Sequence, residues 1–283
     1  AGRDERPVRG KGAAERGHGA VEARGRATRD LKEGRRDALV TAPSNKEAGQ
    51  SEEFRYTGHT EFFGAEFEGE PMMIMCSEVL RVGLVTKHIP VAEVSRNISK
   101  EKILGDLHTL RRSLIRDFGI VEPRIAVMAR NPHAGDGGPL GREAEGIIRR
   151  AIGEACSQGV LASGPVAADR HFAGGGFARY DGILAMYHDQ GLTPFKTLSP
   201  DGVNFTANLS AVRTSPDHGT AFDIAGEGRA DAQSMRNAIY AAIDITQRRR
   251  AWEEWTSNPL PRAEREKSSR DVSVNELPQS ERE

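Results

Sequence analysis

The stretch Asp181-Gly-Ile-Leu-Ala-Met-Tyr-His188-Asp189-Gln190-Gly191 decides the expected fold. Residues 183–187 form a short apolar run, which has the length of a fully buried strand. The run ends abruptly in an imidazole, a carboxylate, an amide and a glycine. In open parallel sheets, ligands bind just beyond the carboxyl ends of the strands. A hydrophobic strand that delivers these polar side chains at its end therefore indicates a functional site.

Two other apolar runs also end in a histidine. Residues 79–86 lead into His88, and residues 124–130 lead into His133. The intervals between these histidines and His188 leave room for a helix and its loops each time. Three parallel strand ends would bring the three imidazoles together, where they suit a divalent transition metal with an open coordination position. The alternative is that each histidine is an ordinary loop residue.

The composition limits the class of protein. The chain has 283 residues, a net charge of −1, 37% hydrophobic residues and 29% charged residues. A near-neutral charge argues against nucleic acid or an anionic membrane as a partner. No apolar window approaches the length of a transmembrane helix, and the first residues contain no apolar signal-peptide core. Cys76 and Cys156 are expected to be two buried free thiols of a cytoplasmic protein.

The order of the segments predicts the domain organisation. Alternating strand and helix signals over residues 37–248 predict an α/β fold with a largely parallel sheet. Residues 1–25 contain almost no apolar anchor, so they are expected to be an atypical segment that is either disordered or a poor helix. Residues 26–248 are the expected catalytic region. Residues 249–283 are charged and have little to bury, which predicts a mostly solvated tail.

Two further segments carry signals of anion or ligand binding. Thr60 is expected to cap a helix whose N–H groups would meet an anion together with His59, and Glu61 suits the first turn of that helix. The alternative is that His59 is only a turn residue. The glycines of residues 134–141 would let the backbone approach a ligand closely. The sequence contains neither a P-loop nor the Gly-x-Gly-x-x-Gly fingerprint of a dinucleotide site.

Five segments together resemble the 4-hydroxythreonine-4-phosphate dehydrogenase (PdxA) family of pyridoxal 5'-phosphate (vitamin B6) biosynthesis. They are Leu39-Val-Thr-Ala-Pro43, Gly58-His-Thr-Glu-Phe62, Asn131-Pro-His-Ala-Gly-Asp-Gly-Gly138, Leu184-Ala-Met-Tyr-His-Asp-Gln-Gly191 and Arg213-Thr-Ser-Pro-Asp-His-Gly-Thr-Ala221. Their order and spacing agree with the family over about residues 26–248. The resemblance implies a fold similar to isocitrate and isopropylmalate dehydrogenases, with two α/β domains around a cleft. The early Gly-Asp-Pro-x-Gly-Ile-Gly-Pro segment of the family is absent, so we expect an incomplete first domain that lacks its N-terminal portion.

The resemblance also implies roles for individual residues. The implied metal ligands are His88, His133 and His188. The implied substrate contacts are His59, Thr60, Lys196, Asn204 and Arg213. The segment that holds the adenosine of NAD in the family is similar to the loop with His218, Gly219, Thr220 and Asp223. Asp189 and Lys196 are the candidate catalytic residues. Asp189 would handle a proton or orient His188, and the alternative is that it only caps a helix.

The function that the resemblance implies is a dehydrogenase reaction on a small phosphorylated hydroxy amino acid. The reaction is the NAD-dependent oxidation, with decarboxylation, of 4-phosphooxy-threonine to 3-amino-2-oxopropyl phosphate. A zinc, cobalt, manganese or magnesium ion would act as a Lewis acid on the substrate hydroxyl, and imidazole ligands favour the transition metals. The family works as a homodimer with a shared active site, so a homodimer is expected. The alternatives are a related dehydrogenase of a phosphorylated four-carbon sugar acid and an inactive truncated paralogue.

Overall fold

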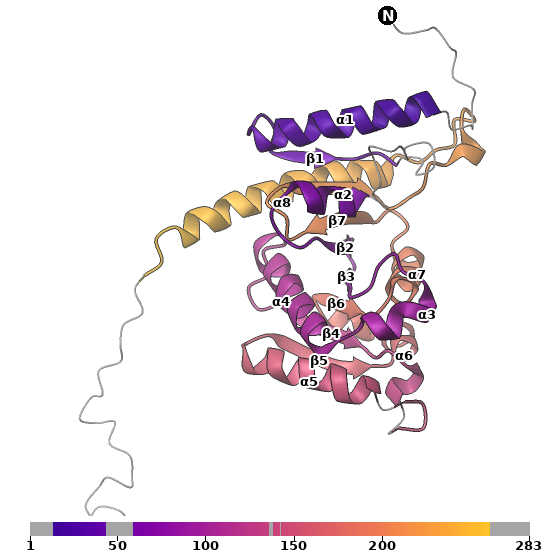
Figure 1. Cartoon of the computed structure of the whole chain (residues 1–283), viewed down its shortest axis with the longest axis vertical. Helices are drawn as coiled ribbons and strands as arrows, with labels where there is room; N and C mark the ends of the chain where they lie inside the picture. The colour runs from indigo at the N-terminus through magenta and orange to yellow at the C-terminus, as the bar shows by residue number, and fades with distance from the viewer. Residues whose placement is uncertain (1–13, 44–58, 136–137, 142, 261–283) are drawn as a thin grey trace, which may run out of the picture. The chain divides into compact units, whose positions relative to one another are not determined.

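A computed structural model of the chain describes residues 14–43, 59–135, 138–141 and 143–260 (Figure 1). Residues 1–250 form one compact unit, and residues 251–283 are a separate unit. The strands are β1 (Ala38–Val40), β2 (Met72–Cys76), β3 (Arg81–Leu84), β4 (Arg124–Met128), β5 (Leu161–Val166), β6 (Gly182–Ala185), β7 (Val203–Ala207) and β8 (Val212–Pro216). The α-helices are α1 (Ala14–Lys32), α2 (His59–Glu66), α3 (Val91–Val94), α4 (Lys100–Arg116), α5 (Glu143–Ser157), α6 (Ala168–Ala173), α7 (His188–Leu198) and α8 (Gln233–Thr256). The 3₁₀ turns are η1 (Ser95–Asn97), η2 (Pro132–Gly135), η3 (Gly176–Arg179) and η4 (Phe222–Ile224).

The strands of the described residues form one sheet in the order β1-β8-β7-β2-β3-β6-β4-β5. Strands β3 to β7 run in one direction, and β1, β2 and β8 run in the other. The α/β class is confirmed. The sheet is mixed rather than largely parallel, because β2 pairs antiparallel with both β3 and β7. The parallel order β3-β6-β4 sets the carboxyl ends of these three strands at one edge, as the positions of His88, His188 and His133 predicted.

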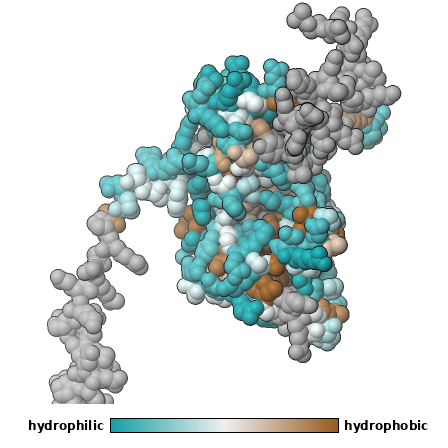
Figure 2. Space-filling model, in the orientation of Figure 1, coloured by the Kyte–Doolittle hydropathy of each residue, from teal (hydrophilic) through white to brown (hydrophobic). Residues whose placement is uncertain are grey.

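Helices cover both faces of the sheet, because successive strand residues point to opposite sides. One core cluster contains Met72 and Ile74 of β2 with apolar residues of α4 and α5. The other cluster contains Met73 and Met75 of the same strand with residues of α7. The face of the molecule seen in Figure 2 is predominantly hydrophilic, with hydrophobic residues scattered over it. Among the described helices, none combines the length and the hydropathy that a membrane span requires.

Helix α4 shows how the sequence pattern produces this packing. Its apolar residues recur every three or four positions, which places them on one helix face. They are Ile103, Leu107, Leu110 and Leu114, and none has any exposed surface. The helix begins where the Ser99 side chain accepts a hydrogen bond from the backbone N–H of Lys102, at 3.1 Å. Burial of each of these side chains stabilises the fold by roughly 1.5–3 kcal/mol.

The structure corrects the expectations for both ends of the described chain. Residues 1–25 were expected to be either disordered or a poor helix, and helix α1 begins at Ala14, so the second part of this segment is helical. Residues 1–13 lie outside the described residues. The helix has few anchors, among them Val21, which packs against the cluster of Phe62 and Phe63. At the other end, Arg249 is not part of a solvated tail. It is 6% exposed within α8, and its Nε donates to Asp117 Oδ1 at 2.7 Å.

Two further local expectations are wrong. Thr60 is not a helix cap, because α2 begins at His59 and Thr60 is buried inside the helix. The two cysteines are both free, but only Cys76 is buried, whereas Cys156 is exposed. Cys156 is near the end of α5, where its thiol donates to the carbonyl of Ala162 at 3.3 Å yet stays exposed, which an apolar residue type alone does not reveal.

Candidate functional site

Side-chain hydrogen bonds tie together the carboxyl ends of β3, β6 and β4. Thr86, just after β3, donates from its hydroxyl to the carbonyl of Met186 at 2.7 Å. Gln190 accepts a hydrogen bond from the backbone N–H of Met186 at 2.8 Å and donates to the carbonyl of Ala129 at 2.6 Å. The amide of the His-Asp-Gln-Gly sequence is therefore a positioning group that holds two strand ends together.

Gly191 lets α7 lie close to the sheet. A Cβ atom at this position would lie 2.8 Å from Val82 Cγ1 and 3.0 Å from Ala185 Cβ. Both neighbours are buried strand residues, so they have little room to move. Any side chain at Gly191 would push α7 outward. The start of α7, which carries His188 and Asp189, would move with it.

His88 and His188 meet at this edge of the sheet. Their ring centroids are 6.0 Å apart and the rings are tilted by 45°. Each ring has a carboxylate at Nδ1, with Glu61 Oε1 at 3.3 Å from His88 and Asp189 Oδ1 at 2.7 Å from His188. A carboxylate at Nδ1 holds the proton on that nitrogen and leaves the lone pair of Nε2 for a metal ion. The two imidazoles line a cavity of about 230 Å³ and suit a divalent cation.

Glu61 is the site residue that the sequence analysis underestimated. The hydrogen bond from His88 lowers the pKa of Glu61 to about 2, so the carboxylate is charged at neutral pH. Its Oε2 atom is buried and has no hydrogen-bond partner among the described residues. From its place in the sequence, Glu61 was expected only to be an acidic residue in the first turn of a helix. Its position two residues after His59, in the Gly-His-Thr-Glu-Phe segment, was the available signal.

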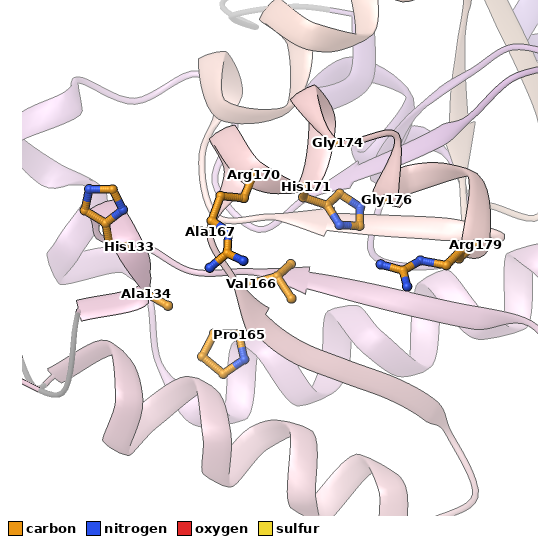
Figure 3. A pocket seen from close by; sticks show the side chains of 10 residues that line it. All are labelled: His133, Ala134, Pro165, Val166, Ala167, Arg170, His171, Gly174, Gly176 and Arg179. Atoms are coloured by element: carbon orange, nitrogen blue, oxygen red, sulfur yellow. The ribbon is translucent and has the colours of Figure 1, made fainter.

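His133 does not join this pair within one chain. It lies in a different cavity, together with Arg170 and His171 (Figure 3). No group of three potential metal ligands occurs in the part of the chain that the structure describes. The prediction that three strand ends unite the trio within one chain is therefore wrong. The reason is the turn after β4, where His133 and Ala134 adopt positive φ angles of 51° and 56° that carry the imidazole away from the other two.

A buried arginine, Arg213, forms a positively charged site next to the histidine pair. We call this site, with its neighbours Thr41, Thr206 and His59, the Arg213 cradle. Arg213 is 4% exposed, and Thr41 Oγ1 accepts hydrogen bonds from its Nε at 3.1 Å and its Nη2 at 2.6 Å. Thr206 Oγ1 accepts from Nη1 at 3.1 Å, and His59 Nδ1 lies 3.0 Å from Nη2. All these partners are neutral groups or a histidine. Burial lowers the pKa of Arg213 to about 10, yet the guanidinium stays charged at neutral pH. A buried positive charge held in this way favours an anionic ligand.

Helix α2 connects the cradle to the histidine pair. His59 reaches Arg213, and two residues later Glu61 reaches His88. The buried Thr60 lies between them. Asn204 of β7 contributes a buried Oδ1 atom with no hydrogen-bond partner among the described residues, which is an open acceptor for a ligand. Four of the five predicted substrate contacts therefore belong to elements that converge here.

Lys196 and Asp217 form an ion pair at the other end of α7. The Lys196 ammonium lies 3.0 Å from Asp217 Oδ1. Burial raises the pKa of Asp217, and the hydrogen bond from Lys196 acts against this shift. Lys196 is half-exposed, so its ammonium stays accessible to a ligand.

The predicted cofactor loop lies between β8 and α8. Its four candidate residues, His218, Gly219, Thr220 and Asp223, are all exposed. His218 Nδ1 lies 2.9 Å from the carbonyl of Gly219. Exposure leaves the loop accessible to a dinucleotide.

The fold and the site together define an α/β enzyme for a small anionic substrate, with the site at the carboxyl ends of the strands. The chain belongs to the family of the pyridoxal phosphate biosynthetic protein PdxA, whose family model matches residues 4–242. This match is wider at its N-terminal end than the resemblance over residues 26–248, and it includes most of the segment that the sequence analysis set apart as atypical.

Individual relatives agree with this assignment. The chain is 50% identical over 249 residues to 4-hydroxythreonine-4-phosphate dehydrogenase of Bacteroides thetaiotaomicron, which covers 87% of this chain and 68% of that relative. The crystal structure of 4-hydroxythreonine-4-phosphate dehydrogenase from Klebsiella pneumoniae has 39% identity and a TM-score of 0.74, covering 86% of this chain and 73% of that one. A terephthalate 1,2-cis-dihydrodiol dehydrogenase from Burkholderia xenovorans LB400 has 26% identity and a TM-score of 0.61, covering 86% and 77%. The matches to curated relatives cover 64% to 68% of their length, so the chain spans about two thirds of them.

Proposed function

We propose that this chain catalyses the NAD-dependent oxidation, with decarboxylation, of 4-phosphooxy-threonine to 3-amino-2-oxopropyl phosphate in pyridoxal phosphate biosynthesis. The observation that carries the proposal is the buried Arg213, which makes no hydrogen bond to a carboxylate of the described residues and adjoins the histidine pair. A phosphorylated substrate explains why such a charge is kept in the fold. The relatives named 4-hydroxythreonine-4-phosphate dehydrogenase support the choice of substrate.

The residues of the cradle would hold the phosphate group. Arg213 supplies a fixed positive charge and planar N–H donors that match phosphate oxygens. His59 and Thr60 stand beside it on α2 and add hydrogen-bonding groups. Asn204 has an open acceptor for the amino group of the substrate. Lys196 would pair with the substrate carboxylate, because its ammonium already holds the Asp217 carboxylate and has donors to spare.

His88 and His188 fit a divalent metal ion, because a carboxylate orients each ring and leaves its Nε2 free. We assign the third ligand to His133 of a second copy, so the working form would be a homodimer with a shared site. When bound, the metal would make the substrate hydroxyl more acidic and stabilise negative charge on its oxygen, and NAD on the exposed loop would accept the hydride. Asp189 holds the proton on Nδ1 of His188 and is the group at which a proton would be handled. Imidazole ligands favour zinc, cobalt or manganese over magnesium.

The carboxylate at His88 gives a direct test of the metal site. We expect Glu61→Gln to weaken the affinity of the full chain for zinc by about 10–100-fold, since an outer carboxylate orients the ligand and raises its basicity. Competition with a metal-sensitive dye measures this affinity without turnover. The matched control is Glu66→Gln on the same helix, because Glu66 pairs with Lys32 at 2.8 Å and not with a histidine. Equal zinc affinity of wild type and Glu61→Gln would remove Glu61 from the metal site.

The proposed reaction is tested by following NADH formation from 4-phosphooxy-threonine with the full chain. Turnover should disappear after chelation and return with added zinc, cobalt or manganese. A phosphorylated four-carbon sugar acid and a non-phosphorylated cis-dihydrodiol are the comparison substrates. Higher kcat/KM for either of them would replace the proposed substrate, and absence of turnover with every metal and substrate would favour the inactive paralogue. Because the proposed reaction consumes NAD in biosynthesis, we place the protein in the cytoplasm.

A further inference from the structure

A second cavity lies beyond His133, apart from the histidine pair. Its volume is about 680 Å³, and the end of β5 forms one wall while α6 and η3 form the other (Figure 3). Pro165 and Val166 give the β5 wall an apolar surface. The volume is in the range of cavities that bind small organic molecules. His133, which we assign to the metal site of a second copy, lines one edge of the cavity, and none of the residues proposed to hold the substrate phosphate lines it.

The opposite wall of this cavity is cationic. The side chains of Arg170 and Arg179 lie on either side of His171 in Figure 3, and both are exposed. Within the described residues, neither guanidinium has an ion pair with a carboxylate. Two positive charges without a partner in one concave site raise the local concentration of anions. Arginine pairs also match the planar arrangement of phosphate or carboxylate oxygens.

His171 adds a buried polar group between the two arginines. It is 6% exposed, and its Nε2 has no hydrogen-bond partner among the described residues. Burial, and secondarily the charge of Arg179, lower the pKa of His171, so the ring is neutral and can donate one hydrogen bond. A buried imidazole nitrogen without a partner is unusual in a folded protein and indicates a missing ligand.

Glycines preserve this arrangement. Gly174 and Gly176 line the same wall, where the absence of side chains lets a ligand approach the backbone. A Cβ atom at Gly176 would lie 3.1 Å from the carbonyl oxygen of His171 and 3.4 Å from its Nδ1. Any larger residue at Gly176 would therefore displace His171. The wall is built around the imidazole and both guanidinium groups.

We propose that this cavity is a second phosphate site, which binds a small organic phosphate through Arg170, Arg179 and His171. The organic part of the ligand lies over Pro165 and Val166, because the cavity is larger than a bare phosphate ion. The site goes beyond the proposed reaction, which uses the Arg213 cradle for its phosphate. Two kinds of ligand would bring a phosphate group into this cavity: the dinucleotide, through its own phosphates, and a separate organic phosphate.

The test uses the full chain carrying Arg213→Met, so that the other cationic site does not contribute. Binding of phenyl phosphate and of inorganic phosphate is measured by isothermal titration calorimetry. Adding Arg170→Gln and Arg179→Gln should weaken phenyl phosphate binding at least about 10-fold, because two charge-assisted contacts are lost. The matched control makes the same change in charge at two other exposed arginines, Arg96→Gln and Arg236→Gln, and should bind like the parent. His171→Phe should weaken binding several-fold.

The outcomes separate the possibilities. Equal affinity of the parent and the Arg170/Arg179 variant for phenyl phosphate would overturn the proposal, and so would equal weakening in the control. If the Arg170/Arg179 variant also loses affinity for NADH, the natural ligand is the dinucleotide. If NADH binding is unchanged while phenyl phosphate binding is lost, the ligand is a separate organic phosphate. None of these measurements depends on turnover, so failure of the proposed reaction would be seen independently.

Discussion

Arg213→Met is expected to lower kcat/KM for 4-phosphooxy-threonine by at least about 10-fold while leaving the protein as stable as wild type. Thr41, Thr206 and His59 occupy four of the five guanidinium N–H groups, so one Nη1–H is left for a charge-assisted hydrogen bond to the phosphate. Such a bond is worth about 1.5–3 kcal/mol, and its loss should lower kcat/KM by about 10–100-fold, mainly through KM. The buried charge itself contributes little to folding, because burial disfavours the charged form, only the nearby Glu61 carboxylate acts against this, and its hydrogen bonds are with neutral groups or a histidine. Methionine fills a similar space without that charge, so the free energy of unfolding should stay within about 1 kcal/mol of wild type or rise.

Arg249→Met provides the matched control for this prediction. Arg249 is also a buried arginine, but its Nε–H donates to the fully buried Asp117 at 2.7 Å. Its removal leaves a buried carboxylate with less compensation, which should cost about 3–5 kcal/mol of unfolding free energy while KM stays unchanged. Urea unfolding and steady-state kinetics measure the two quantities. Arg213 would be a structural residue if Arg213→Met lost several kcal/mol of stability and kept its KM.

The sequence predicted the sheet well because burial leaves a direct signal. Continuous apolar runs located β3, β4 and β6, and a histidine after each of them indicated that their ends share one edge. The antiparallel pairs of β2 were not predicted, because an apolar run carries no information about strand direction. Helix α6 was not predicted, and α7 entered only as the helix that Asp189 would cap, since short segments with glycine and proline, such as Pro194, have weak helical periodicity.

The sequence could not predict which side chains meet at the site. The left-handed turn at His133 sends its side chain away from the other histidines, and a non-glycine residue at positive φ has no sequence signature. The role of Glu61 depends on its contact with His88, which is distant in the chain. The resemblance gave Arg213 as a substrate contact, but its neutral surroundings of Thr41 and Thr206 were visible only in the folded chain.

Mixing two inactive variants, His133→Ala and His188→Ala, is expected to restore activity. In the proposed homodimer, each site takes His88 and His188 from one copy and His133 from the other. A mixed dimer then has one site with both lesions and one intact site. Half of randomly exchanged dimers are mixed, so the activity should reach about a quarter of wild type. The variants can be exchanged by denaturation and refolding together, with refolded wild type as the reference for recovery.

The matched control is the mixture of His88→Ala and His188→Ala. These two imidazoles lie in one chain, with ring centroids 6.0 Å apart, so every site of a mixed dimer lacks one of them. This mixture should therefore stay inactive after the same exchange. Restoration by both mixtures would mean that His88 and His188 act in different sites. If neither mixture recovered activity although wild type did, all three ligands would have to come from one chain, which requires His133 to leave the cavity that it shares with Arg170.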